Sequence, residues 1–235
     1  MNVLVFGGSG GIGLALTKHV LNTVRDSHVI ATYYHSAPSF IHSRLTWQRV
    51  NVTNEEELQT LSKDYPKLDW IINCIGLLHD EQHGPEKSLA SVTPEWFLHT
   101  MSINTLPTLL IAKHFSNNLK RSDQPRMSVL SARVGSIRDN RLGGWYSYRS
   151  SKAALNMLIK DISIEWHRTM PKASIIALHP GTTDTQLSEP FQANVPDGKL
   201  FTPAYVAQCL FELIQTFSPE QSGSFVAYDG TPIPW

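Results

Sequence analysis

A tyrosine and a lysine in the segment GGWYSYRSSKAALN, residues 143–156, have the types and the spacing that proton transfer needs. Tyr148 and Lys152 are four positions apart, so on a helix they share one face, with Cβ atoms about 5–6 Å apart. A phenol has a pKa of about 10 in water. A nearby ammonium group favours the phenolate and lowers that pKa toward neutrality. Tyr146 has only Ser150 four positions later, so the spacing favours Tyr148 as the proton donor, but a pair this short also arises by chance on helices.

The elements that must position this pair follow a regular alternation along the chain. Short β-branched runs, several of them almost wholly apolar, alternate with stretches of helical periodicity. This alternation predicts right-handed βαβ units and a doubly wound α/β sheet with helices on both faces. The predicted strands are Asn2–Phe6, His28–Tyr34, Leu45–Val52, Asp69–Gly76, Met127–Ala132, Ala173–Pro180 and Ser224–Tyr228. The predicted helices are Ile12–Thr23, Glu55–Lys63, Pro94–Lys120, Tyr146–Thr169 and Pro203–Phe217.

The bulk composition is that of a globular protein with one large core. The 235 residues are 41 % hydrophobic and 17 % charged, and no linker, repeat or low-complexity tract divides residues 1–235, so we expect a single domain. Twenty Lys and Arg balance twenty Asp and Glu, which argues against a nucleic-acid partner. Two cysteines are too few for a disulfide framework, so we expect a reduced, cytoplasmic protein. The N-terminus lacks the basic region of a signal peptide, and no apolar run reaches the roughly 18 residues of a membrane span.

A glycine-rich segment, FGGSGGIG, lies between the first predicted strand and the first predicted helix. Glycine lets the backbone turn tightly and approach a pyrophosphate, which then lies at the helix N-terminus. The position of the segment, at the end of a strand and the start of a helix, is the context that makes a dinucleotide site credible. Its glycine spacing, Gly7-x3-Gly11-Ile12-Gly13, differs from the usual G-x-G-x-x-G.

That glycine spacing resembles the loop of the short-chain dehydrogenase/reductase family, and the resemblance extends over nearly the whole chain. NCIG (residues 73–76) is similar to the family's N-x-x-G element, and Asn104 in MSINTLP matches its active-site asparagine. LSARVGS supplies the serine segment, YRSSK the Tyr-x-x-x-Lys pair, and HPGTTDT the Pro-Gly turn. The segments around the Tyr-Lys pair and the terminal DGTPIPW resemble the C-factor-like, sniffer-type branch. The resemblance implies a Rossmann-type sheet of parallel strands in the order 3-2-1-4-5-6-7.

The resemblance also implies the site residues and their roles. Tyr148 is expected to protonate the developing alkoxide, Lys152 to lower the pKa of that phenol and to bind the nicotinamide ribose, and Tyr146 to pack near the helix start. Ser131 is expected to hold the carbonyl oxygen, and Asn104 to anchor a water that relays protons to Lys152. The expected cofactor-binding residues are Gly7, Ser9, Gly10, Gly11, Ile12, Gly13, Tyr34, His35, Asn51, Val52, Asn73, Ile75, Gly76, Tyr148, Lys152, Pro180, Gly181, Thr183 and Thr185.

Three departures from the family pattern affect this expectation. Phe6 replaces the usual threonine that braces the glycine turn, and Asn51 replaces the acidic residue that usually holds the adenine amino group. The catalytic serine is usually the second of a pair, and Ala132 occupies that position. Ser131 is the neighbouring candidate and Ser136 a more distant one.

Cofactor choice is read after the second strand, where NAD-binding proteins place an acidic residue that grips both ribose hydroxyls. The segment ATYYHSAPS has no acid between Ile30 and Asn54. An acid would repel a 2′-phosphate, so its absence favours NADP over NAD. His35 is the one basic group within the segment ATYYHSAPS, and Tyr34, Ser36 and Ser9 are further possible hydrogen-bond donors to the cofactor.

Three other features carry weaker signals. HDEQH, residues 79–83, is not the zinc-protease motif and lies before Gly84-Pro85, so we interpret it as a loop and expect no metal site. Trp145 either lines the substrate pocket or simply packs against neighbouring side chains. The stretch 185–201 has little periodicity, and long loops in compact domains are often lids, so we expect a substrate lid there.

The leading hypothesis is an NADPH-dependent carbonyl reductase or alcohol dehydrogenase that acts on a small-molecule substrate. The alternative is a nucleotide-binding signalling or regulatory protein of the same fold, which the alanine at position 132 favours. The family resemblance and the apolar runs LPTLLIA and ALNMLI imply a homodimer or homotetramer that associates through the two long helices.

Overall fold

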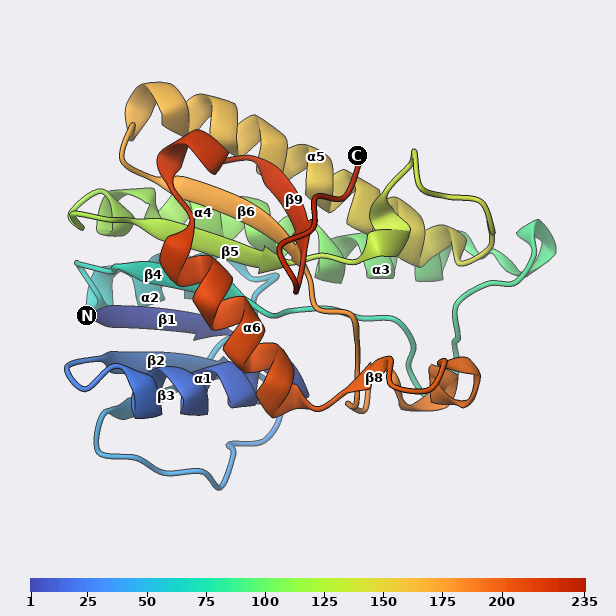
Figure 1. Ribbon diagram of the computed structural model, residues 1–235, viewed down its shortest axis with the longest axis horizontal. Helices are drawn as coiled ribbons and strands as arrows, with labels where there is room; N and C mark the ends of the chain where they lie inside the picture. The colour runs from blue at the N-terminus through green and yellow to red at the C-terminus, as the bar shows by residue number, and fades with distance from the viewer.

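A parallel sheet forms the centre of the molecule, with its strands in the order β3-β2-β1-β4-β5-β6-β9 (Figure 1). The computed structural model describes the backbone of residues 1–235 and every side chain except that of Asn194. Each neighbouring pair of strands is parallel. The strands are β1 (Asn2–Phe6), β2 (His28–Tyr33), β3 (Leu45–Arg49), β4 (Trp70–Asn73), β5 (Arg126–Leu130), β6 (Ser174–His179) and β9 (Ser224–Ala227). The predicted doubly wound topology is confirmed.

Helices cover both faces of the sheet, and each face has its own hydrophobic core. Successive residues of a strand point to opposite faces, so Leu4 and Phe6 enter one core while Val3 and Val5 enter the other. The first core is closed by α2 (Glu55–Asp64), α4 (Leu106–Leu119) and α5 (Tyr146–Thr169), and the second by α1 (Gly11–Thr23) and α6 (Pro203–Thr216). Strands buried on both faces explain the almost continuous apolar runs in the sequence.

The single helix predicted over Pro94–Lys120 is wrong, because two helices occupy this stretch. They are α3 (Pro94–Asn104) and α4, and they separate at Thr105, whose φ is −118° and ψ −55°. Pro107 has no N–H to donate to the carbonyl four residues earlier, so the helical hydrogen-bond ladder is interrupted there. The hydroxyl of Thr105 donates to the carbonyl of Ser151 at 2.9 Å, which fixes the break against α5.

The stretch 185–201, for which the sequence predicted no regular element, contains a short 3₁₀ helix, η3 (Glu189–Asn194). A separate parallel pair, β7 (Thr182–Thr183) with β8 (Leu200–Phe201), joins the two ends of this stretch. Further 3₁₀ turns are η1 (Leu89–Ser91), η2 (Arg133–Gly135) and η4 (Pro219–Gln221). The loops that follow β4, β5 and β6 gather beyond the carboxyl ends of the strands (Figure 1). In the part of the chain that the structure describes, no helix is long and apolar enough to span a bilayer.

Candidate active site

The Tyr148–Lys152 pair lies in the first turns of α5, where both side chains are buried. Tyr148 is 8 % exposed and Lys152 is 2 % exposed, and the Lys152 ammonium lies 5.8 Å from the centroid of the Tyr148 ring. Lys152 Nζ donates to the carbonyl oxygen of Leu130, at the end of β5, at 3.0 Å. The lysine is therefore held against the carboxyl end of the sheet, one helical turn from the phenol.

Burial dominates the acid–base behaviour of both groups. It raises the pKa of the Tyr148 phenol above its usual value, and it lowers the pKa of Lys152 to about 8. Desolvation disfavours whichever form carries the charge, so the phenol keeps its proton while the ammonium loses its proton more easily. The sequence predicted that Lys152 would lower the pKa of Tyr148. In the structure burial raises the pKa of Tyr148, and the Lys152 ammonium lies 5.8 Å from the centroid of the ring.

Asn104 ties the loop after β4 to α5. Its Oδ1 accepts from the backbone N–H of Leu77 at 2.6 Å, and its Nδ2 donates to the Leu77 carbonyl at 2.8 Å and to Ser151 Oγ at 2.9 Å. Asn104 is the last residue of α3, so the break at Thr105 is what directs this side chain between the two elements. A Cβ placed on Gly76 would lie 3.6 Å from Lys152 Nζ and 4.0 Å from Asn104 Oδ1, so both groups border the same small space.

The two candidate serines are already hydrogen-bonded to other groups. Ser131 Oγ donates to Asn156 Oδ1 on α5 at 2.6 Å, although the residue itself lines the cavity described below. Ser136 Oγ donates to the carbonyl of Pro234 at 2.5 Å, which fastens it to the C-terminal segment. Ser131 therefore remains the predicted carbonyl-binding residue, whereas the Ser136 hydroxyl is bonded to the C-terminal segment and does not line the cavity.

The glycine-rich segment forms a cradle that side chains would fill. A Cβ on Gly13 would lie 2.2 Å from the carbonyl oxygen of Gly7, and a Cβ on Gly11 would lie 2.5 Å from a methyl carbon of Thr185. Gly7 has a φ of +69°, and its N–H donates to Thr32 Oγ1 on β2 at 3.1 Å. A threonine hydroxyl thus braces the turn from the neighbouring strand, although the threonine is 25 residues away in the sequence.

A cavity of about 420 Å³ joins this cradle to the Tyr148–Lys152 pair. Its lining comprises Ser9, Gly10, Gly11, Ile12, Gly13, Cys74, Ile75, Gly76, Leu130, Ser131, Tyr148, Lys152, Pro180, Thr185, Gln186 and Leu187. Eight predicted cofactor-binding residues lie outside this lining. Four of them belong to segments that border the cavity: Gly7, Asn73, Gly181 and Thr183. The other four follow the ends of β2 and β3: Tyr34, His35, Asn51 and Val52. A backbone cradle at the N-terminus of α1 suits a dinucleotide pyrophosphate, so the residues fit the expected cofactor.

Two lining residues and one basic residue were not singled out from the sequence. Gln186 and Leu187 reach the cavity from the stretch after β7. Arg49, the last residue of β3, pairs with Tyr33 and donates from Nε to the carbonyl of Tyr34 at 3.1 Å. This contact brings a guanidinium beside Tyr34 and His35, whose rings lie 4.5 Å apart. The strand order could have suggested it, because β3 neighbours β2.

The loop segment 79–83 folds around Asp80. Asp80 Oδ1 accepts from the backbone N–H groups of Gln82 and His83 at 2.8 and 2.6 Å, and from His83 Nδ1 at 3.0 Å. The His83 ring stacks on Trp96 with centroids 4.7 Å apart. No group of three or more metal-ligating side chains occurs among the residues that the structure describes.

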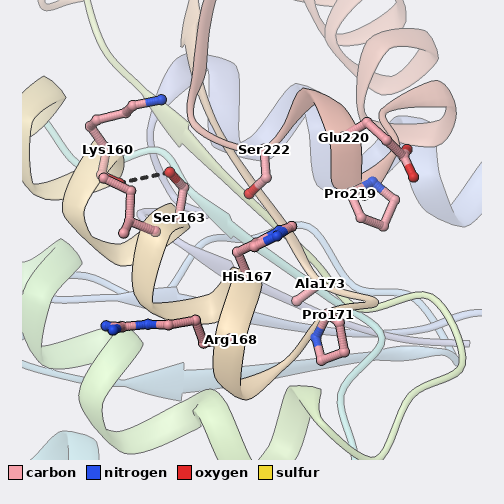
Figure 2. Close-up of a pocket in the computed structure, with 10 residues that line it drawn as sticks. Lys160, Ser163, His167, Arg168, Pro171, Ala173, Pro219, Glu220 and Ser222 are labelled. Atoms are coloured by element: carbon pink, nitrogen blue, oxygen red, sulfur yellow. Dashed lines mark hydrogen bonds between the residues drawn. The ribbon is translucent and has the colours of Figure 1, made fainter.

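A second cavity, of about 380 Å³, lies at the opposite end of the sheet, between the last turns of α5 and η4 (Figure 2). Ala173 and Ser222, which border it, precede β6 and β9. Ser163 Oγ donates to the Lys160 carbonyl at 2.7 Å within it. Dinucleotides bind at the carboxyl ends of parallel strands, so the candidate active site is the cavity beside the glycine cradle.

Comparison with known proteins agrees with this geometry. Residues 1–196 match the family model described as short chain dehydrogenase, so the chain belongs to the short-chain dehydrogenase family of oxidoreductases. It is 30 % identical over 240 residues to 1-hydroxy-2-glutathionyl-2-methyl-3-butene dehydrogenase of Rhodococcus sp. (strain AD45), covering 99 % of each chain. The solved carbonyl reductase Sniffer of D. melanogaster has the same fold, with a TM-score of 0.84 and 24 % identity, over 100 % of this chain and 99 % of that one. The NADPH-bound carbonyl reductase from chicken fatty liver gives a TM-score of 0.86 and 24 % identity, over 100 % of this chain and 94 % of that one.

Proposed function

We propose that this oxidoreductase is an NADPH-dependent carbonyl reductase. The observation that carries the proposal is the single cavity whose one end is the glycine cradle and whose other end holds Tyr148 and Lys152. A nicotinamide dinucleotide, when bound, supplies the hydride. Tyr148 donates its phenolic proton to the carbonyl oxygen, which becomes an alcohol. Lys152 binds the nicotinamide ribose, Ser131 holds the carbonyl oxygen, and Asn104 anchors a water that returns protons to the lysine.

The preference for NADP rests on the charge at the end of β2. No acidic residue occurs between Ile30 and Asn54, while His35 and Arg49 supply basic groups beside Tyr34. A guanidinium suits a phosphate because it donates two parallel hydrogen bonds. The NADPH-bound carbonyl reductase that shares this fold supports the same choice.

The stretch 185–201 is proposed to act as a substrate lid on a single domain that spans residues 1–235. Thr185, Gln186 and Leu187 already line the cavity, and η3 follows them directly. The β7–β8 pair joins the two ends of the stretch, and η3 lies between them. A lid of this kind would exclude water while the proton is transferred.

Self-association is proposed through α4 and α5, as a homodimer or homotetramer. Four large apolar side chains on these helices are exposed to solvent: Leu106 by 36 %, Leu109 by 42 %, Met157 by 61 % and Ile164 by 53 %. A groove of about 560 Å³ lies between the same two helices. A second copy would cover this apolar surface. Sedimentation at micromolar concentration tests the proposal, and a monomer would contradict it. The cytoplasm is the proposed location, which two free cysteines, Cys74 and Cys209, support.

The competing function is a nucleotide-binding regulatory protein without turnover. Two observations favour it: Ala132 stands where a catalytic serine is usual, and the Ser131 hydroxyl is directed to Asn156. The buried phenol and lysine favour the enzyme, because burying an ionisable group costs free energy that a binding protein need not spend.

Replacing Tyr148 with Phe tests the choice between these functions. The substitution removes one hydroxyl, so NADPH binding should persist while carbonyl reduction falls about 10²–10⁴-fold, the usual contribution of a general acid. Tyr146→Phe is the matched control and should leave the rate unchanged, since Tyr146 has no lysine one turn later. A wild-type protein that binds NADPH but reduces none of a panel of aldehydes, ketones and quinones would favour the regulatory function.

A further inference from the structure

Glu86, in the loop after β4, carries a buried carboxylate that has no part in the chemistry proposed above. The residue is 4 % exposed, and it is the one buried residue within the described range 79–95. No cationic side chain in the described part of the chain forms an ion pair with it. Burying a charged group costs free energy unless hydrogen bonds compensate. The groups that donate to Glu86 therefore indicate what its carboxylate is there to hold.

The hydrogen bonds that Glu86 accepts all come from the N-terminus of α5. The backbone N–H of Ser147 donates to Glu86 Oε2 at 3.1 Å, and the Ser147 hydroxyl donates to Oε1. The backbone N–H of Trp145 donates to the Glu86 carbonyl oxygen at 2.5 Å. Trp145 is the N-cap residue of α5, and its side chain makes no capping bond. A carboxylate is stabilising at this end of a helix, so Glu86 caps α5 from a distant loop.

The backbone that enters α5 is strained. Gly143, Gly144 and Trp145 have φ values of +64°, +65° and +51°, so three successive residues are left-handed. Trp145 is the one non-glycine with a positive φ among the residues that the structure describes. A left-handed residue with a side chain persists only where surrounding contacts impose its conformation. The bonds from Trp145 and Ser147 to Glu86 are contacts of that kind.

Tyr148 is held by the two residues that bond to Glu86. It follows Ser147 directly in the chain, and its ring lies 6.2 Å from the Trp145 ring, with the two ring planes at 70°. A general acid works only within hydrogen-bond reach of the atom that it protonates. A misplacement of about 1 Å can lower a rate about 10²-fold. Whatever fixes Ser147 and Trp145 therefore also controls how well the phenol can donate its proton.

We propose that Glu86 is the positioning residue for the general acid Tyr148. Its carboxylate fixes the first turn of α5 through Ser147, its backbone carbonyl fixes Trp145, and these two residues set the direction of the phenol. Glu86 does not line the cavity beside the glycine cradle, so it acts on the reaction only through α5. This inference rests on the proposed reductase function, in which Tyr148 donates the proton.

Glu86→Gln tests the proposal, because it keeps the size of the side chain and replaces one acceptor oxygen with an amide nitrogen that cannot accept. With NADPH and a carbonyl substrate from the panel above, kcat should fall about tenfold, as expected for a misplaced general acid. The Kd of NADPH should stay within about twofold of wild type, because the glycine cradle is unchanged. Glu95→Gln is the matched control, since Glu95 is an exposed carboxylate in the first turn of α3, and it should leave both values unchanged.

The Tyr148→Phe background separates positioning from a merely structural role. Without the phenol there is no acid to position, so Glu86→Gln should change the residual rate less than about twofold. A variant that only lowered the fraction of folded protein would lower the rate equally in both backgrounds. Equal losses in the two backgrounds, or no loss when Tyr148 is present, would overturn the inference. Ser147→Ala removes one of the same bonds from the α5 side, and it provides the same comparison if Glu86→Gln does not fold.

Hydrogen exchange separates this inference from the proposed function, because it needs no turnover. Amide exchange in the segment 143–150 should be about tenfold faster in Glu86→Gln than in wild type, and unchanged in Glu95→Gln. If the wild type reduces no carbonyl but this pattern holds, the reductase function fails and the fixing of α5 by Glu86 stands. If the wild type reduces carbonyls but Glu86→Gln exchanges like wild type in this segment, the positioning role fails and the reductase function stands.

Discussion

Lys152→Met is expected to stabilise the fold while it abolishes turnover. Lys152 is 2 % exposed, and burial lowers its pKa from an ordinary 10.5 to about 8. A tenfold change in proton affinity corresponds to about 1.4 kcal/mol, so the charged lysine costs about 3 kcal/mol of folding free energy below pH 8. Methionine has a similar length and no charge. It loses the hydrogen bond to the Leu130 carbonyl, a loss of about 1 kcal/mol. The variant should therefore be about 2 kcal/mol more stable at pH 7.

The sign of this effect changes with pH. Between about pH 8 and 10.5 the unfolded chain keeps the lysine proton while the folded chain releases it, so the stability of the wild type rises with pH in that window. The advantage of the variant should shrink across the same window. Near pH 10.5 the variant should be the less stable protein by about 1 kcal/mol, because only the lost hydrogen bond remains.

Urea unfolding of both proteins at pH 7, 8, 9 and 10 measures this difference directly. Lys160→Met is the matched control, since Lys160 is an exposed lysine two turns further along α5. Its difference from wild type should not vary over the same range. A Lys152→Met protein that is less stable than wild type at pH 7, or a difference that does not change with pH, would refute the reasoning from burial.

Three further outcomes are expected. Gly13→Ala should abolish NADPH binding in a fluorescence titration, because the added Cβ would lie 2.2 Å from the backbone oxygen of Gly7. Gly84→Ala is the control and should bind NADPH normally, since no atom lies within 4 Å of a Cβ at that position. Arg49→Gln should weaken NADPH about tenfold and leave NADH unchanged in the same titration, since one charge-assisted hydrogen bond is lost; equal effects on both would mean that Arg49 does not contact the 2′-phosphate. Asn104→Leu removes three hydrogen bonds and should lower the urea midpoint by an amount that corresponds to about 2–4 kcal/mol.

The features that were predictable from the sequence are those with a local cause. A short, almost continuous apolar run predicts a strand that is buried on both faces. Leu4 and Val5 enter opposite cores because successive side chains of a strand point to opposite faces. The glycines at 11 and 13 were predictable because a cradle for a pyrophosphate tolerates no Cβ. The Tyr148–Lys152 spacing was readable because α5 is a regular helix at that point.

The features that were not predictable depend on contacts between distant segments. The break at Thr105 needs Ser151 as an acceptor, and the direction of the Ser131 hydroxyl depends on Asn156. Trp145 could not be assigned from sequence, because its left-handed backbone is imposed by a residue 59 positions earlier, Glu86. A four-residue spacing likewise reports that Lys152 is a neighbour of Tyr148, but it does not report how much solvent the fold removes around the phenol, whose pKa burial raises.

Burial keeps the Tyr148 phenol in its protonated form. A general acid must hold its proton before the reaction, and burial raises the pKa of Tyr148, so the phenol is protonated throughout the neutral range. A charged Lys152 favours the phenolate form of Tyr148. Burial lowers the pKa of Lys152 to about 8, so this influence weakens above pH 8. At neutral pH the phenol of this pair therefore carries its proton, which is the form that a general acid needs.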